Sequence, residues 1–200
     1  MKKDIERAVR ALKEGKIIIY PTETCYGIGC DATDEEAVKK VFEAKKRPET
    51  KKLTCIVSDL DMAKRYCKLS EKGEKLCREF MPGPLTFVAE KREGRISDAV
   101  NEDFAFRVSS DPLCRKLSIE VNRPVVATSA NISGKSSRYS VEEMSEDIVE
   151  SADVVLDRGE IEKNQPSTIA GLEEGELKVY REGPVSENEL REFMEGVDDE

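Results

Sequence analysis

Apolar positions in this chain follow two periods, one typical of helices and the other typical of buried strands. Near the start, Ile5, Ala8, Val9 and Leu12 lie at helical spacing and predict a helix over 3–14 that Gly15 ends. The next residues form a β-branched apolar run that stops at a proline. This run predicts a strand that is buried on both faces.

The same two periods predict the remaining elements. Helices are expected at 35–44, 59–67, 70–80, 112–121, 140–151 and from 187 onward, and strands at 53–57, 85–89, 104–108, 124–127, 154–156, 167–172 and 177–181. Capping residues support three helix starts: Thr33 or Asp34, Ser140 with Glu143, and Ser186 with Glu189. Because helices and strands are mixed throughout, we expect an α/β fold with a mixed sheet.

Length and composition narrow the class of protein. The chain has 200 residues, which suits one domain over 1–185 followed by an acidic C-terminal helix and tail over 186–200. No run is long and apolar enough to span a bilayer, and the start lacks the apolar core of a signal peptide, so we expect a cytoplasmic protein without a membrane partner. The six cysteines form no CxxC pair, which suits a reducing compartment and offers no metal spacing.

Charge and the lack of histidine exclude several kinds of chemistry. The chain contains no histidine, which excludes Ser-His-Asp and Cys-His nucleophiles and histidine metal sites. The net charge of −9 argues against a general nucleic-acid binder. Bases nevertheless outnumber acids between 39 and 95, and such a basic region suits a polyanionic small ligand.

The first polar cluster follows the first strand. We expect residues 21–29 to form a loop at the carboxyl end of that strand, where α/β sheets usually bind ligands. Thr22, Thr24 and Tyr26 alternate there and would project to one side of an extended loop. Gly27 and Gly29 would let a ligand approach the backbone. A tight turn with ordinary polar residues is the alternative.

Two further clusters also follow predicted elements. Lys45, Arg47 and Lys51 suit a triphosphate, although a solvated helix terminus has the same composition. The residues after the strand at 124–127 offer hydroxyls and an amide for phosphate or adenine, or they satisfy their own loop backbone. They are Thr128, Ser129, Asn131, Ser133, Ser136 and Ser137. Arg107 and Arg181 are either site residues or surface ion pairs. Neither a Walker A motif nor GxGxxG occurs.

An ordered set of motifs resembles one known family. The motifs are Pro21-Thr22-Glu23-Thr24-Cys25-Tyr26-Gly27, Lys45-x-Arg47-Pro48, Pro82-Gly83-Pro84-Leu85-Thr86, Ala127-Thr128-Ser129-Ala130-Asn131-x-Ser133-Gly134, Ser167-Thr168-Ile169 and Arg181-Glu182-Gly183. Together, over roughly residues 5–185, they are similar to the YrdC-like family of L-threonylcarbamoyladenylate synthases in its short stand-alone form.

The resemblance implies a fold and a reaction. The expected fold is a twisted mixed sheet, flanked by helices, around a large basic cavity. The expected reaction joins L-threonine, bicarbonate or CO2, and ATP into threonylcarbamoyl-AMP and pyrophosphate, with Mg²⁺ bound to the ATP. This nucleotidyltransferase product serves the N6-threonylcarbamoyladenosine modification at position 37 of tRNA. The expected partner is a transferase that completes the modification, with weak or no direct tRNA binding by this chain.

The resemblance also implies roles for individual residues. It assigns L-threonine to Thr22, Thr24, Tyr26, Arg107 and Thr128. It assigns ATP to Lys45, Arg47, Lys51, Ser129, Asn131, Ser137 and Arg181, with Lys45 and Arg47 as the catalytic pair and no metal ligand from protein side chains. Ser109 and Asp111 stand where many relatives have proline and histidine, which is a departure in the expected cavity wall.

Two other functions are open at this stage. The first is an enzyme that forms a carbamoyl-adenylate, as in the related part of hydrogenase-maturation proteins, which are far longer. The second is a non-catalytic RNA-binding module, although the acidic net charge and the few aromatic residues count against it.

Overall fold

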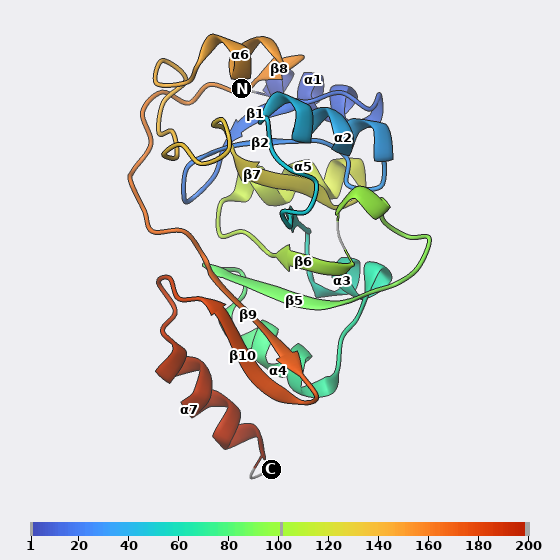
Figure 1. Ribbon diagram of the computed structural model, residues 1–200, viewed down its shortest axis with the longest axis vertical. Coiled ribbons are helices and arrows are strands. Elements are labelled where there is room, and N and C mark those ends of the chain that lie inside the picture. Colours follow the sequence, from blue (N-terminus) through green and yellow to red (C-terminus); the bar gives the residue numbers. More distant parts are fainter. Residues whose placement is uncertain (1, 101, 199–200) are drawn as a thin grey trace.

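The computed structural model describes residues 2–100 and 102–198, and its central feature is a ten-stranded mixed sheet. The strands lie in the order β10-β9-β5-β6-β3-β7-β2-β1-β8, and β4 pairs with β5 off this path. Helices flank the sheet, and the two ends of the chain lie at opposite ends of the molecule (Figure 1). The expected α/β fold with a mixed sheet is confirmed.

The elements have the following bounds. The strands are β1 (Ile18–Pro21), β2 (Tyr26–Gly29), β3 (Thr54–Ile56), β4 (Cys67–Lys68), β5 (Leu85–Lys91), β6 (Asp103–Arg107), β7 (Val125–Ser129), β8 (Val154–Val155), β9 (Thr168–Glu173) and β10 (Glu176–Arg181). The helices are α1 (Lys2–Lys13), α2 (Glu35–Ala44), α3 (Leu60–Tyr66), α4 (Glu71–Phe80), α5 (Pro112–Val121), α6 (Glu146–Glu150) and α7 (Glu187–Asp198), with a short 3-10 turn at Asp98–Val100.

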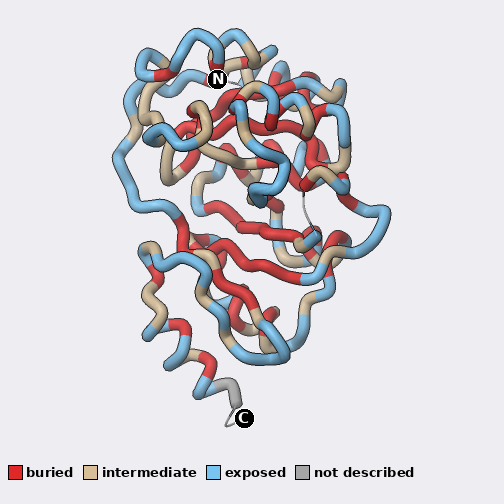
Figure 2. The backbone as a smooth tube through the Cα atoms, viewed as in Figure 1, coloured by how far each residue is buried: buried red, intermediate tan, exposed pale blue. Residues whose placement is uncertain are grey.

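The central strands of the sheet are buried on both faces. In β1, Ile19 packs into one hydrophobic cluster with residues of α2 and α4, whereas Ile18 and Tyr20 pack into a second cluster. Leu12 of α1 and Leu117 of α5 belong to that second cluster. This alternation puts α1 and α5 on one face of the sheet, and Figure 2 shows the buried backbone running through the strands between the exposed helix surfaces.

Residues 21–29 form a hairpin, so their prediction as a single loop is wrong. The turn at 22–25 leads into β2, which pairs antiparallel with β1 and with β7. Gly29 has no room for a side chain, since a Cβ there would lie 1.7 Å from the carbonyl oxygen of Val126. The chain that approaches this glycine is therefore β7, so the expected close approach of a ligand is wrong for Gly29, whereas it stays a prediction for Gly27.

Local capping explains where two of the helices begin. Asp34 is the N-cap of α2, because its Oδ1 accepts a hydrogen bond from the backbone N of Ala37 at 3.1 Å. Ser186 and Glu189 form the expected capping box before α7, with Glu189 Oε2 2.8 Å from the backbone N of Ser186. Both predicted caps are confirmed.

The predicted capping box at residue 140 is wrong. Glu143 accepts a hydrogen bond from the backbone N of Tyr139 at 2.8 Å instead. The helix begins only at Glu146, with Ser145 as its N-cap. The carboxylate of Glu143 therefore stabilises an irregular loop, and residues 140–145 lie outside the helix.

The C-terminal helix packs on the far end of the molecule. Leu190 and Met194 are buried, and the Phe193 ring meets the Phe80 ring of α4 edge-on with a centroid separation of 5.7 Å. The predicted apolar face of this helix is confirmed.

Candidate active site

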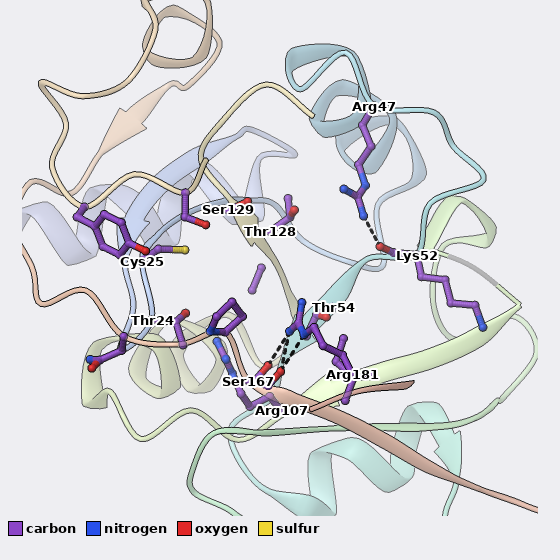
Figure 3. Close-up of a pocket in the computed structure, with 16 residues that line it drawn as sticks. Thr24, Cys25, Arg47, Lys52, Thr54, Arg107, Thr128, Ser129, Ser167 and Arg181 are labelled. Atoms are coloured by element: carbon purple, nitrogen blue, oxygen red, sulfur yellow. Dashed lines mark hydrogen bonds between the residues drawn. The ribbon is translucent and has the colours of Figure 1, made fainter. Parts of the chain in front are cut away.

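A polar cavity of about 280 Å³ opens on one face of the sheet. It is the same face on which α1 and α5 pack beside the cavity. Paired residues of β3 and β7 explain its position. Ile56 of β3 and Val125 of β7 lie opposite each other and pack into the core. Thr54 and Ala127 are the next pair on the same face, two residues along each strand, and they line the cavity. The lining residues, drawn in Figure 3, are Thr24, Cys25, Arg47, Lys52, Thr54, Arg107, Ala127, Thr128, Ser129, Ser137, Tyr139, Asn164, Pro166, Ser167, Ile169 and Arg181.

The charged groups on this lining are all cationic within the described part of the chain: Arg47, Lys52, Arg107 and Arg181. Figure 3 shows Arg107 and Arg181 at one side of the cavity and Arg47 with Lys52 at another. The Lys52 ammonium pairs with Asp103 at 2.9 Å, so Arg47 is the cation available on its side. The arrangement suits a ligand with two separate anionic groups, one near Arg47 and one near Arg107 and Arg181.

Two of these arginines have no acidic partner in the described residues. The Arg47 Nη2 donates to the Lys52 carbonyl at 2.7 Å, and its buried Nε has no hydrogen-bond partner. Arg181 donates from Nε and Nη2 to the Ser167 carbonyl, at 3.1 and 2.7 Å. Burial lowers the pKa of both guanidinium groups, and Arg107 adds to that effect at Arg181. Both positive charges are therefore available to an anion.

Arg107 is held by a carboxylate from the β1–β2 turn. Its Nη1 lies 3.1 Å from Glu23 Oε1, and the side chain of Arg107 is almost wholly buried at the end of β6. The other oxygen of Glu23 accepts a hydrogen bond from the hydroxyl of Ser109. The Arg107 Nε is buried without a hydrogen-bond partner.

The turn at 22–25 is built around the hydroxyl of Thr22. This oxygen accepts hydrogen bonds from the backbone N atoms of Thr24 and Cys25 at 3.1 and 3.2 Å, and it donates to the Cys25 carbonyl at 2.6 Å. As a result Thr24 and Cys25 line the cavity, whereas Thr22 lies behind them. Burial raises the pKa of the Cys25 thiol, so it is a neutral part of the wall.

Lys45 holds the loop after β7 through hydrogen bonds to its backbone. It is only 1% exposed, and its ammonium donates to the backbone carbonyls of Ser129 and Asn131, the latter at 2.8 Å. Burial, together with the nearby charge of Arg47, lowers the pKa of Lys45 to about 8. The lysine thus fixes the Ser129–Asn131 backbone against the cavity.

An extended segment, 157–167, crosses from β8 to β9 and supplies one wall (Figure 1). The Tyr26 hydroxyl holds its start, accepting from the backbone N of Arg158 at 2.8 Å and donating to the Gly159 carbonyl at 2.8 Å. Further along, the Asn164 amide donates to the Glu23 carbonyl at 3.0 Å. Tyr26 therefore anchors this wall from outside the cavity.

The structure brings most of the predicted site residues together. Thr24, Arg47, Arg107, Thr128, Ser129, Ser137 and Arg181 all line the cavity, although they come from distant parts of the sequence. Thr22, Tyr26, Lys45, Lys51 and Asn131 do not. Thr22 and Tyr26 therefore do not project into the cavity with Thr24, and that expectation is wrong.

Lys51 and Asn131 are two of the predicted site residues that do not line the cavity. Lys51 is exposed, with its Nζ 3.5 Å from the Ser133 hydroxyl. The Asn131 amide donates to two carbonyls of its own loop at 2.8 Å, and its buried Oδ1 has no partner. Their predicted contacts with ATP stay predictions.

Several lining residues were not predicted from the sequence. Lys52 lies next to the predicted Lys51, and its backbone carbonyl accepts the hydrogen bond from Arg47 while its ammonium turns away to Asp103. Thr54 lies one alternation from a core position of β3, so strand periodicity is the signal that could have found it. Asn164 lies on an extended segment that has no hydrophobic period, whereas Ser167 opens the motif Ser167-Thr168-Ile169, and that motif is the signal that could have found it.

The donor set of the cavity fits a metal ion only as part of a nucleotide complex. Among the described lining residues there is no carboxylate, and among all described residues no group of three or more His, Cys, Asp or Glu is placed to hold a metal.

None of the described helices is long and apolar enough to cross a membrane.

Comparison with known proteins gives a consistent result. The Sua5/YciO/YrdC family model, described as telomere recombination, matches residues 10–183. A Methanocaldococcus jannaschii protein, to which threonylcarbamoyl-AMP synthase activity is provisionally assigned, is 37% identical over 92% of this chain and 87% of that protein. The threonylcarbamoyl-AMP synthase of Vibrio vulnificus is 36% identical over 84% of this chain and 94% of its own length.

Solved structures give the same result. The structure of Pyrococcus abyssi Sua5 in complex with L-threonine superposes with a TM-score of 0.88 at 34% identity, covering 96% of this chain and 58% of Sua5. The chain thus spans little more than half the length of that relative. Escherichia coli YciO has a TM-score of 0.83 at 23% identity, covering 95% of this chain and 93% of YciO, which shows a shared fold.

Proposed function

The chain belongs to the Sua5/YciO/YrdC family, and from this premise we propose that it is a threonylcarbamoyl-AMP synthase. In the proposed reaction L-threonine, bicarbonate or CO2, and ATP give threonylcarbamoyl-AMP and pyrophosphate. The product supplies the t6A modification of tRNA, so we expect the enzyme to act in the cytoplasm beside a transferase. One observation carries the proposal: the cavity joins arginines on two separate sides to a row of small hydroxyls, without a carboxylate among its described lining residues.

This lining suits substrates that supply their own nucleophiles. The nitrogen of L-threonine attacks CO2 and loses a proton, which gives a carbamate. A carbamate oxygen then attacks the α-phosphorus of ATP, and the bond to the β-phosphate breaks to release pyrophosphate. The protein has to position these groups and neutralise their charge, so no histidine or reactive cysteine is needed.

The two cationic sides of the cavity divide the substrates. Arg107, with Thr24, is placed to bind the carboxylate and hydroxyl of L-threonine. Arg47 and Ser129 are placed to bind the phosphates of ATP across the cavity, with Thr128 between the two sites. Arg181 lies beside Arg107 and is the exception to this division, because we assign it to ATP, which it would meet from the L-threonine side.

Lys45 acts through the loop that it supports. Its ammonium already donates to the Ser129 and Asn131 carbonyls, so it holds the hydroxyl of Ser129 in position. Mg²⁺ enters, in this proposal, as the complex with ATP, because the lining carries no carboxylate for a resident ion. Carried in with ATP, Mg²⁺ would supply charge neutralisation during pyrophosphate release.

Pyrophosphate release tests the proposal. We expect release from ATP only when L-threonine, bicarbonate and Mg²⁺ are all present. Release that is indifferent to L-threonine would contradict the proposal and favour a carbamoyl-adenylate. Absence of turnover together with salt-dependent RNA binding would favour an RNA-binding module.

A further inference from the structure

Two buried side chains and one half-buried carboxylate form a relay behind the L-threonine side of the cavity. Glu23 lies in the β1–β2 turn, Arg107 ends β6, and Ser109 follows two residues later. Glu23 Oε1 lies 3.1 Å from Arg107 Nη1, and Glu23 Oε2 accepts a hydrogen bond from the Ser109 hydroxyl. Arg107 is 5% exposed, Ser109 0% and the Glu23 side chain 17%, and the Glu23 Oε1 atom itself is buried, so solvent has little access to these contacts.

The relay occupies only part of the Arg107 guanidinium. Glu23 meets the Nη1 atom, whereas the buried Nε has no hydrogen-bond partner and the side chain lines the cavity. Arg181 brings a second guanidinium close to the first and has no acidic partner in the described residues. Two positive charges therefore share one carboxylate, which leaves room for one further anionic group.

Ser109 determines how Glu23 meets Arg107. Both oxygens of a free carboxylate can pair with a guanidinium, and such a bidentate pair covers a whole edge of the arginine. Because the Ser109 hydroxyl holds Oε2, only Oε1 faces Arg107. The hydroxyl is fixed in turn, since it accepts a hydrogen bond from the backbone N of Asp111 at 3.1 Å at the start of α5.

We propose that Glu23 and Ser109 are positioning residues that keep one edge of the Arg107 guanidinium free for the carboxylate of L-threonine. The inference rests on the proposed function, which supplies the substrate. Neither residue has to touch L-threonine. Ser109 acts through Glu23, and Glu23 acts through Arg107. Loss of the serine hydroxyl releases Oε2, so that Glu23 competes with the substrate for the arginine.

The test compares two ligands that differ only at the carboxylate. Isothermal titration of the intact protein with L-threonine and with L-threoninol, whose carboxylate is replaced by a hydroxymethyl group, measures the preference for the carboxylate. We expect Ser109→Ala to reduce that preference by about tenfold, the range of one hydrogen bond to a charged group, with little change in L-threoninol affinity. Glu23→Asp keeps the charge but withdraws it from Arg107. The guanidinium then loses the contact that orients it, so this variant should also lose the preference for the carboxylate.

Two variants serve as controls. Ser109→Thr retains the hydroxyl and should retain the preference. Ser118 is equally buried and donates to the Arg123 carbonyl at 2.9 Å, away from the cavity, so Ser118→Ala should lower stability without changing the preference. An unchanged preference in Ser109→Ala and Glu23→Asp overturns the inference, as does an equal loss of affinity for both ligands.

The wild-type protein separates the two levels of the proposal. If it binds L-threonine but does not distinguish it from L-threoninol, the inference fails and the proposed activity stands. If it binds neither ligand and forms no product from L-threonine, the proposed function fails and the inference fails with it.

Discussion

Lys45 should make the stability of this protein depend on pH in a specific direction. Its ammonium is buried between α2 and the loop after β7, where burial lowers its pKa from 10.5 to about 8. The substitution Lys45→Met keeps an unbranched side chain of similar length and removes the titrating group. It also leaves the Ser129 and Asn131 carbonyls without their donor, which adds a cost that does not vary with pH.

The sign follows from the direction of the pKa change. The folded protein binds this proton less tightly than the unfolded chain does, so the proton costs stability below about pH 8. That cost disappears as the pH rises from about 8 to 10.5. The difference of about 2.5 pKa units corresponds to about 3 kcal/mol, at about 1.4 kcal/mol per unit. Between pH 7 and pH 9.5 the recovered part is about 2 kcal/mol.

Urea unfolding of the wild type and of Lys45→Met across this pH range measures the effect. Other titrating groups are common to both proteins and cancel in the difference of their unfolding free energies. We expect the wild type to gain about 2 kcal/mol on the variant between pH 7 and pH 9.5. Parallel curves would refute the reasoning, because they would mean that burial does not govern the proton on Lys45.

Two further substitutions test the site and the sheet. Arg47→Ala should raise the KM for ATP, measured by pyrophosphate release, about 10- to 100-fold, because a charge-assisted contact is lost. Arg78 is exposed and serves as the control, so Arg78→Ala should leave this KM unchanged. Equal KM values for the two variants would remove Arg47 from the ATP site. Gly29→Ala should lower the unfolding free energy by about 3 kcal/mol or more, because the new Cβ would lie 1.7 Å from the Val126 carbonyl oxygen. Gly196→Ala is the matched control, because a Cβ at Gly196 would have no heavy atom within 4 Å. Equal urea midpoints for the two glycine variants would contradict that packing.

The sequence predicts elements well where local chemistry determines them. Asp34 caps α2 through its own side chain, and the hairpin at 168–181 turns at a glycine with positive φ, Gly175. Non-local pairing explains one failure, and a competing local contact explains another. Tyr26-Gly27-Ile28-Gly29 looks like a glycine-rich loop, but β7, about a hundred residues later, pairs with it and makes it a strand. Glu143 fits a capping box by spacing, but the loop before it takes the carboxylate.

In the candidate site, too, local motifs predict some residues and tertiary packing determines the others. Arg47, Arg107 and Ser129 follow predicted elements at recognisable motifs, and the fold brings them to one cavity. Lys45 belongs to the same motif as Arg47, but its side chain turns under the β7 loop, which only the packing of α2 against that loop determines. The wall formed by 157–167 has no periodic pattern and is fixed by contacts from Tyr26 and Glu23, both distant in sequence.

The most direct test of the account follows labelled carbon into the product. The protein is incubated with ATP, Mg²⁺, L-threonine and ¹³C-bicarbonate, and the nucleotides are analysed by mass spectrometry. The account predicts threonylcarbamoyl-AMP that carries one ¹³C at its carbamoyl carbon, formed in equal amount with pyrophosphate. Labelled carbamoyl-AMP without threonine, or unlabelled nucleotides only, would contradict it.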